Sequence, residues 1–224
     1  MLELEGVRIS YGSQTVIGDL DWRVGVDGLV TALLGPSGCG KSTLIRAIAG
    51  LEDVERGSIR LDGADLGRVP PHRRDFGVVF QDGQLFGGRS VGANVGYGLR
   101  ARRMSRTSVA RRVAEMLELV QLPGFEKRSV DELSGGQAQR VAVCRALVNA
   151  PAVVLADEPT GNLDSATSAA VEDILFGLHR DEGITLVVVT HDDDLAAKCD
   201  RRVELQDGVV IADERVGTRA QDGD

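Results

Sequence analysis

The first residues with a chemical signature form a glycine-rich segment at residues 35–43. It matches the pattern G-x-x-x-x-G-K-[ST] at every fixed position and follows an apolar run, residues 29–34, typical of a buried strand. The glycines allow backbone N–H groups to face phosphate oxygens, and a helix beginning near Lys41 adds a favourable dipole. The pattern therefore predicts a nucleoside triphosphate site, and a chance glycine-rich turn is the disfavoured alternative. The residues expected to contact the nucleotide are Gly35, Pro36, Ser37, Gly38, Cys39, Gly40, Lys41, Ser42 and Thr43.

A second chemical pattern lies at residues 153–158, where four apolar residues are followed by Asp157 and Glu158. In open parallel sheets ligands gather at the carboxyl edge of the strands, so Asp157 is expected to help hold Mg²⁺ there, together with the Ser42 hydroxyl. Lys41 is expected to reach the β- and γ-phosphates. Glu158 is placed to act as a general base on an attacking water. Alone, this pair is a weak signal, because many such pairs are solvated strand ends; beside the glycine-rich segment it favours catalysis.

The elements that must position these groups follow from the apolar pattern. Alternating apolar residues at the N-terminus predict a strand, for which an edge position is one placement. Further strands are expected at 29–34, 58–61, 76–80, 152–156, 184–189 and 202–205, and helices from Lys41 to Ala49 and at 90–103, 105–122, 137–149 and 166–179. These elements predict a largely parallel α/β core that is interrupted by a helical insertion. The expected parts of this single domain are a core of about 1–85 and 150–213, a helical subdomain of about 86–149, and a polar tail of about 214–224.

A third motif, Leu133-Ser-Gly-Gly-Gln137, resembles the signature of ATP-binding cassette (ABC) ATPases. With the other motifs in the same order, residues 1–212 resemble one nucleotide-binding domain of this family. The resemblance implies a P-loop NTPase core with an N-terminal antiparallel β portion. It also implies that two chains enclose two ATP molecules, the signature of each meeting the γ-phosphate bound by the other. The signature residues expected to contact ATP are Ser134, Gly135, Gly136 and Gln137.

The same resemblance assigns roles to single residues. Tyr11 resembles the aromatic residue that stacks on adenine, with an exposed turn tyrosine as the alternative. Gln81 resembles the glutamine that links the Mg²⁺ site to the membrane partner. His191 resembles the switch histidine at the γ-phosphate, and residues 162–164 resemble the D-loop. The residues expected to take part in hydrolysis are thus Lys41, Gln81, Glu158 and His191, and those expected to hold the metal are Ser42, Gln81 and Asp157.

Composition and charge argue against a nucleic-acid-binding protein, a membrane-spanning protein and a disulfide-bonded secreted protein. The 224 residues carry a formal net charge of −8, which argues against a surface that grips nucleic acid. We find no apolar run near the ~20 residues that span a bilayer, and the N-terminus does not look like a signal peptide. Three widely spaced cysteines suggest neither disulfides nor a metal site. These features predict a cytoplasmic protein, which the resemblance places peripherally on the inner face of the membrane through a membrane partner.

Charge is distributed unevenly, because residues 68–112 contain ten arginines and only two acidic residues. One interpretation is a solvated helical face. The other is a surface for an acidic partner or anionic lipid headgroups.

The resemblance implies an Mg²⁺-dependent ATPase that pairs with a second copy or a paralogous subunit and drives integral membrane transport subunits, without nucleic acid. The alternative from another class is a mechanotransmitter for a membrane protein that controls an envelope process. A soluble ABC protein of repair or translation is disfavoured, because no coiled-coil insertion or second cassette is present. Cues to the cargo conflict: residues 71–82 resemble importers, whereas residues 155–164 resemble the lipoprotein-release and cell-division group.

Overall fold

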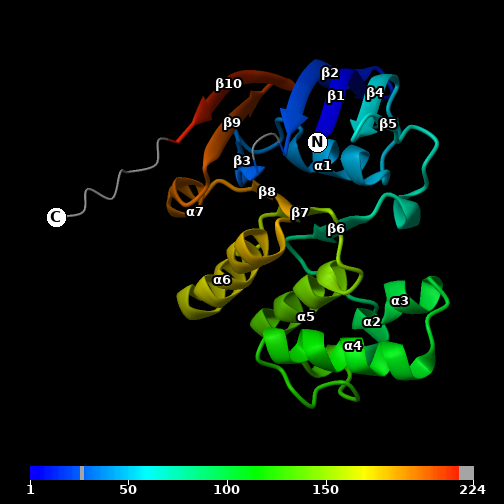
Figure 1. Ribbon diagram of the computed structural model, residues 1–224. Coiled ribbons are helices and arrows are strands. Elements are labelled where there is room, and N and C mark those ends of the chain that lie inside the picture. Colours follow the sequence, from blue (N-terminus) through cyan, green and yellow to red (C-terminus); the bar gives the residue numbers. More distant parts are fainter. Residues whose placement is uncertain (26–27, 217–224) are drawn as a thin grey trace. The chain divides into compact units, whose positions relative to one another are not determined.

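The computed structural model describes residues 1–25 and 28–216, so most of the expected polar tail, residues 217–224, lies outside the described part. The chain divides into two compact units (Figure 1). Unit 1 comprises Met1–Val69 and Val187–Asp224, and unit 2 comprises Pro70–Leu186. The elements combine helices with antiparallel and parallel strands, which confirms the predicted α/β class.

Unit 1 contains an antiparallel sheet and a set of mainly parallel strands. The antiparallel sheet has the order β2-β1-β4-β5, and in the other set β9, β3 and β8 run parallel while β10 lies antiparallel to β9. Strand β8 crosses the division, because its first two residues belong to unit 2. The strands are β1 (Leu2–Tyr11), β2 (Gln14–Val24), β3 (Thr31–Leu34), β4 (Arg56–Leu61), β5 (Ala64–Asp65), β8 (Thr185–Val189), β9 (Arg201–Gln206) and β10 (Val209–Arg215).

The N-terminal strand β1 is a central strand, so the predicted edge position is wrong. It pairs with β2 on one side and with β4 on the other, as Leu4 opposite both Trp22 and Ile59 shows. Its apolar residues alternate because one face of the antiparallel sheet is buried and the other is solvated, and a central strand shares that pattern with an edge strand. Alternation therefore identified the strand but not its neighbours.

The described part of unit 1 includes the helices α1 (Lys41–Ala49) and the short α7 (Asp193–Ala197). Helix α1 begins at the predicted residue, and it buries Leu44, Ile45 and Ile48 in the unit's core. It ends at Gly50, whose left-handed backbone lets its N–H bond back to the last turn of the helix. The buried face of α1 fixes the orientation of the glycine-rich segment that precedes it.

Unit 2 consists of two parallel strands, the start of β8, and helices. Residues of β6 and β7 pair in register from Phe76 opposite Val153 to Val79 opposite Ala156, and every residue of β7 is buried. At the start of β8, the Thr185 N–H donates to the carbonyl of Ala152. The elements are 3-10 helix η2 (Pro71–Arg73), β6 (Phe76–Val79), α2 (Val91–Val95), α3 (Tyr97–Ala101), α4 (Arg106–Leu119), η3 (Val130–Glu132), α5 (Gly135–Leu147), β7 (Val153–Asp157) and α6 (Ser165–Glu182).

The helix expected at 90–103 is two short helices, α2 and α3, separated at Gly96. Glycine weakens a helix interior, and here Gly96 ends α2 and precedes α3, with its N–H closing the last turn of α2 onto the Gly92 carbonyl. Helix α5 packs against α4, where the thiol of Cys144 donates to the Met116 carbonyl and burial raises the pKa of that thiol to about 12. Among residues 1–25 and 28–216, no helix combines the length and apolar content needed to cross a bilayer.

Candidate functional site

The glycine-rich segment connects β3 to α1 in unit 1. Its glycines Gly35, Gly38 and Gly40 have φ values of 143°, 83° and 104°. A Cβ on Gly35 would collide with the carbonyl oxygen of Leu205, and one on Gly40 would lie 2.7 Å from Ile17 Cδ1, so packing requires glycine at both positions. Around Gly38 the corresponding space is open. No side chain caps the N-terminus of α1, so its first N–H groups are left for a phosphate.

Lys41 lies over this loop. Its ammonium donates to the carbonyl oxygens of Gly35, at 2.7 Å, and of Pro36, at 3.0 Å. Ser42 follows in the first turn of α1 and is exposed, whereas Cys39 is buried within the loop. The loop therefore presents the Lys41 cation, the exposed Ser42 hydroxyl and an uncapped helix terminus, which suit a polyphosphate and a hard cation.

His191 belongs to the same edge of unit 1. Strands β3 and β8 are parallel, with Leu33 opposite Val189, and the Thr190 N–H donates to the carbonyl of Leu33 at 3.3 Å. The residues that follow these strands, the glycine-rich loop and the exposed His191, thus leave the sheet at its carboxyl edge. Tyr11 is half exposed at the end of β1, and the β2 residues Val16 and Ile17 beyond the hairpin turn lie against Gly40.

The other predicted residues lie in unit 2, where β6 and β7 bring them together. Asp157, the last residue of β7, is buried, and Glu158 follows it with a left-handed φ of 48°. Gln81 lies just beyond β6 at the same edge. Gln81 and Glu158 flank Gly161, at which a Cβ would lie 3.2 Å from Gln81 Nε2 and 3.6 Å from Glu158 Cβ. Unit 2 therefore supplies a carboxylate pair and an amide at one edge of parallel strands.

The signature residues form the N-terminus of α5. The Ser134 hydroxyl accepts from the Gln137 N–H at 3.3 Å, and Gln137 Oε1 accepts from the Ser134 N–H at 3.1 Å, which is a complete capping box. Gly135 is exposed, and a Cβ on Gly136 would lie 2.8 Å from Thr167 Cγ2. Two side chains of the motif thus already have a structural role, while the glycines keep the helix terminus accessible.

Asp164, in the segment resembling a D-loop, caps α6. Its carboxylate accepts hydrogen bonds from the Thr167 N–H at 3.0 Å and the Thr167 hydroxyl at 2.8 Å. These bonds favour the charged form, so they hold the pKa of Asp164 below its ordinary value. Thr167 therefore bonds to Asp164 and leaves no room for a side chain at Gly136.

The sequence motifs did not predict two polar residues of α5, Gln139 and Arg145. Gln139 is buried and Arg145 is half-buried, and both donate to carbonyls of the loop that follows β6. The sequence could have indicated Gln139, because a polar residue on the apolar face of a helix must find a buried partner. Gln139 lies on the buried side of α5 with Val141, Ala142 and Val143.

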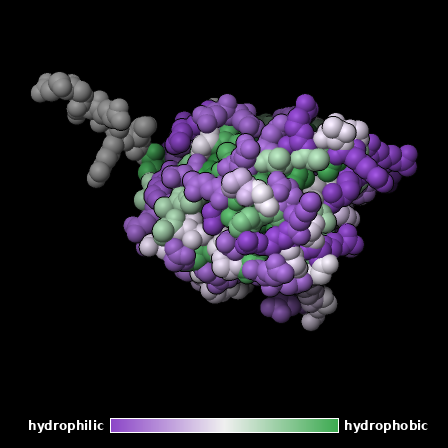
Figure 2. All heavy atoms as spheres, turned by 90° about the horizontal axis from the view of Figure 1, so that it is seen from below, coloured by the Kyte–Doolittle hydropathy of each residue, from purple (hydrophilic) through white to green (hydrophobic). Residues whose placement is uncertain are grey.

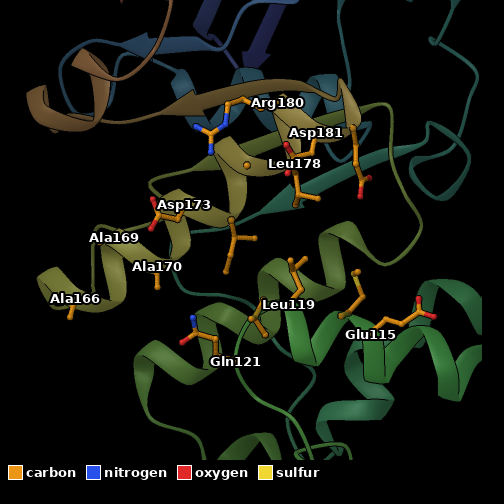
Figure 3. Close-up of a pocket in the computed structure, with 15 residues that line it drawn as sticks. Glu115, Leu119, Gln121, Ala166, Ala169, Ala170, Asp173, Leu178, Arg180 and Asp181 are labelled. Carbon is orange, nitrogen blue, oxygen red and sulfur yellow. The ribbon is translucent and has the colours of Figure 1, made fainter.

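Unit 2 also has a groove of about 700 Å³ between α4 and α6. Figure 3 shows Leu119, the last residue of α4, and Gln121, just after it, facing Ala166, Ala170 and neighbouring residues of α6 across the groove. None of the sequence-predicted site residues lines this groove. It is separate from the two residue sets described above.

A glycine-rich phosphate loop between a parallel strand and a helix, with acidic residues at the end of another parallel strand, defines a P-loop nucleotide-binding protein. Residues 20–161 match the family model described as ABC transporter, and the chain belongs to this family. Its fold resembles a dimeric post-hydrolysis structure of the ATP-binding cassette MJ0796 bound to ADP and Pi, with a TM-score of 0.89 and 33% identity over 97% of this chain and 100% of that one.

Curated relatives include subunits of importers. The chain is 45% identical over 209 residues to the Fe(3+) ions import ATP-binding protein FbpC of Streptomyces coelicolor, covering 93% of this chain and 60% of the relative. It is 48% identical over 187 residues to the spermidine/putrescine import ATP-binding protein PotA of Acidothermus cellulolyticus, covering 84% of this chain and 48% of the relative. The chain thus spans about half to three fifths of these relatives' length.

Proposed function

We propose that this protein is the ATP-binding and ATP-hydrolysing subunit of an ABC importer. The observation that carries the proposal is the phosphate loop of unit 1, with its left-handed glycines, its lysine and the uncapped start of α1. The family membership and the import proteins among its relatives support both the nucleotide and the direction of transport.

In the proposed reaction each polar group has a defined task. Phosphate oxygens replace the Gly35 and Pro36 carbonyls as acceptors for Lys41, because a charged acceptor makes the stronger hydrogen bond. Ser42, Gln81 and Asp157 offer the oxygen ligands that Mg²⁺ prefers, and bound Mg²⁺ would neutralise charge developing on the phosphates. Glu158 takes a proton from the attacking water, His191 contacts the γ-phosphate, and Tyr11 stacks on adenine.

Dimerisation completes the proposed site. The accessible N-terminus of α5, with Gly135 exposed, provides N–H groups for the γ-phosphate held by a second copy or a paralogous subunit. Binding of ATP then stabilises the closed dimer, and hydrolysis reopens it. The dimeric cassette structure among the similar proteins supports this arrangement.

The membrane subunit is proposed to meet the helical segment after Gln81, and through it the protein would attach to the inner face of the membrane. On the face shown in Figure 2, small apolar patches lie among hydrophilic residues. Phe86 and Tyr97 are exposed with ring centroids 4.9 Å apart. A groove of about 730 Å³ is lined by Tyr97, Arg102, Arg103 and other residues of unit 2. This basic groove fits an acidic helical segment of a membrane protein, whereas the solvated-face interpretation requires no partner.

The variant Glu158→Gln tests the function directly. We expect it to bind ATP as the unchanged protein does, to form a stable dimer with ATP, and to hydrolyse ATP at least about a hundredfold more slowly. Lys41→Ala serves as the control that loses ATP binding. Full turnover by Glu158→Gln would show that the base is misassigned, and an unchanged protein that neither binds nor hydrolyses ATP would contradict the proposal.

Purification with the native membrane partner separates the two function classes. A partner with many spans together with a solute-binding protein supports import. A four-span partner with a large extracytoplasmic domain supports the mechanotransmitter alternative or export.

A further inference from the structure

Gln139 of helix α5 connects two loops that carry predicted catalytic groups. Its side-chain Nε2 donates to the carbonyl oxygen of Phe80 at 3.1 Å and to that of Pro159 at 3.0 Å. The side chain is 3% exposed, so these bonds form away from water. Both protons of one amide group are therefore used to hold two segments that are 79 residues apart in the chain.

The two acceptors directly neighbour the reacting groups. Phe80 precedes Gln81, and Pro159 follows Glu158. The Phe80 carbonyl belongs to the peptide unit that joins Phe80 to Gln81, so its shift moves Gln81 directly. The Pro159 carbonyl lies beyond the Pro159 ring, which fixes φ at that residue, so its shift is passed to Glu158 through one further peptide unit. Gln139 thereby sets the separation between the amide predicted to ligate Mg²⁺ and the carboxylate predicted to activate water.

The turn at Glu158 needs such support. Its φ of 48° is uncommon for a residue with a side chain, and such a conformation persists only where the surrounding structure holds it in place. The Gly161 N–H bonds to the Glu158 carbonyl at 3.2 Å and closes the turn from one side. The bond from Gln139 to Pro159 fixes it from the helix side.

The loop after β6 is held by α5 at a second point. Arg145 donates to the carbonyls of Gly83, at 2.9 Å, and Gln84, at 2.7 Å. Gly83 itself lies close to Gln139, since a Cβ there would sit 3.3 Å from Gln139 Oε1. The helix that begins with the signature thus binds three backbone carbonyls of this loop, those of Phe80, Gly83 and Gln84. Of its two donors, only Gln139 also reaches the turn at Glu158.

We propose that Gln139 is a positioning residue for ATP hydrolysis, which keeps Gln81 and Glu158 in register by bridging the carbonyls of Phe80 and Pro159. This role rests on the proposed ATPase function. It differs from ordinary core packing because both bonds end at backbone next to the predicted reacting groups. Loss of the bridge is expected to impair the chemical step more than the binding of ATP to the phosphate loop, which lies in unit 1.

The test compares Gln139→Leu with the unchanged full chain. We expect kcat for ATP hydrolysis to fall about ten- to hundredfold, because small misplacements of catalytic groups have effects of this size. The amount of ATP bound per chain and its Kd are expected to stay within about twofold, since the phosphate loop keeps its own contacts. Arg112→Gln is the matched control. It also removes a side-chain bond to a backbone carbonyl, that of Val148 at 3.3 Å, at the other end of α5.

A second variant, Gln139→Glu, separates positioning from packing. An ionised carboxylate would face two carbonyl oxygens, whereas its protonated form can donate to one of them. The activity of this variant relative to the unchanged protein is therefore expected to rise as the pH falls. The inference is overturned if Gln139→Leu keeps its kcat, or if binding stoichiometry and kcat fall together, as misfolding requires. An unchanged protein without ATPase activity would instead refute the proposed function itself.

Discussion

The side-chain ammonium of Lys41 and the carbonyl oxygen of Gly35 form a hydrogen bond of 2.7 Å across the phosphate loop. This bond joins the two ends of the loop and gives the ammonium a partner before any nucleotide arrives. Because Gly35 also packs against the carbonyl of Leu205 on β9, the loop is attached to unit 1 at its first residue. Its first glycine therefore supports the fold, whereas the middle of the loop is free to meet a ligand.

This contrast predicts different outcomes for two glycine substitutions. Gly35→Ala places a methyl group against the Leu205 carbonyl, so we expect a large loss of stability and little folded protein. Gly38→Ala meets no atom within 4 Å, and only its φ of 83° opposes the change, at about 1–2 kcal/mol. We expect this variant to fold and to bind ATP more weakly. Thermal unfolding and ATP titration of both variants provide the measurement. Equal Tm values for the two would contradict the packing argument.

The cap of α6 predicts a pH-dependent contribution to stability. The pKa of Asp164 is lowered by the hydrogen bonds from Thr167, so the charged cap stabilises the fold above the carboxyl's unfolded pKa of about 3.9. That contribution is lost as the pH falls through the lower, folded pKa. We therefore expect the unchanged protein to have a higher Tm than Asp164→Ala near neutral pH, and this difference to shrink in acid to that of a neutral cap.

The control for this prediction is Asp164→Asn, which can accept the same N–H bond but does not titrate. Its Tm advantage over Asp164→Ala should not depend on pH. A difference between the unchanged protein and Asp164→Ala that is as large in strong acid as at neutral pH would rule out the charged cap.

The basic groove of unit 2 predicts a specific assembly defect. Arg102 and Arg103 line this groove, and Arg100 lies close by on α3. Replacing all three by glutamine removes three positive charges, of which that of Arg102 pairs with Asp75 at 2.6 Å. We expect recovery with the native membrane subunits to fall on the order of tenfold, with ATP affinity unchanged. Co-purification from native membranes at several salt concentrations measures the effect. Arg180→Gln, on α6 beside the separate groove of Figure 3, is the control. Unchanged assembly of the triple variant would favour the solvated-face interpretation.

Local patterns in the sequence specify much of this fold. The glycine-rich loop and the start of α1 at Lys41 were predictable because phosphate loops and helix termini depend on residues a few positions apart. The α/β class followed from apolar runs, and the family from motifs in a fixed order. The central position of β1 was not predictable, because pairing partners come from distant segments that leave no trace in its own alternation.

The candidate site likewise has features that short motifs predict and features that only the packing of distant segments decides. The sequence by itself determined which residue types occupy the loop, the strand ends and the signature, since each motif is a short contiguous stretch. Only the tertiary structure decided that Gln139 bridges Phe80 and Pro159, and that Arg145 holds Gly83 and Gln84. Those bonds end on backbone carbonyls, which every residue possesses. Their formation depends on how α5 packs beside β6 and β7, and not on the identity of the residues that accept them.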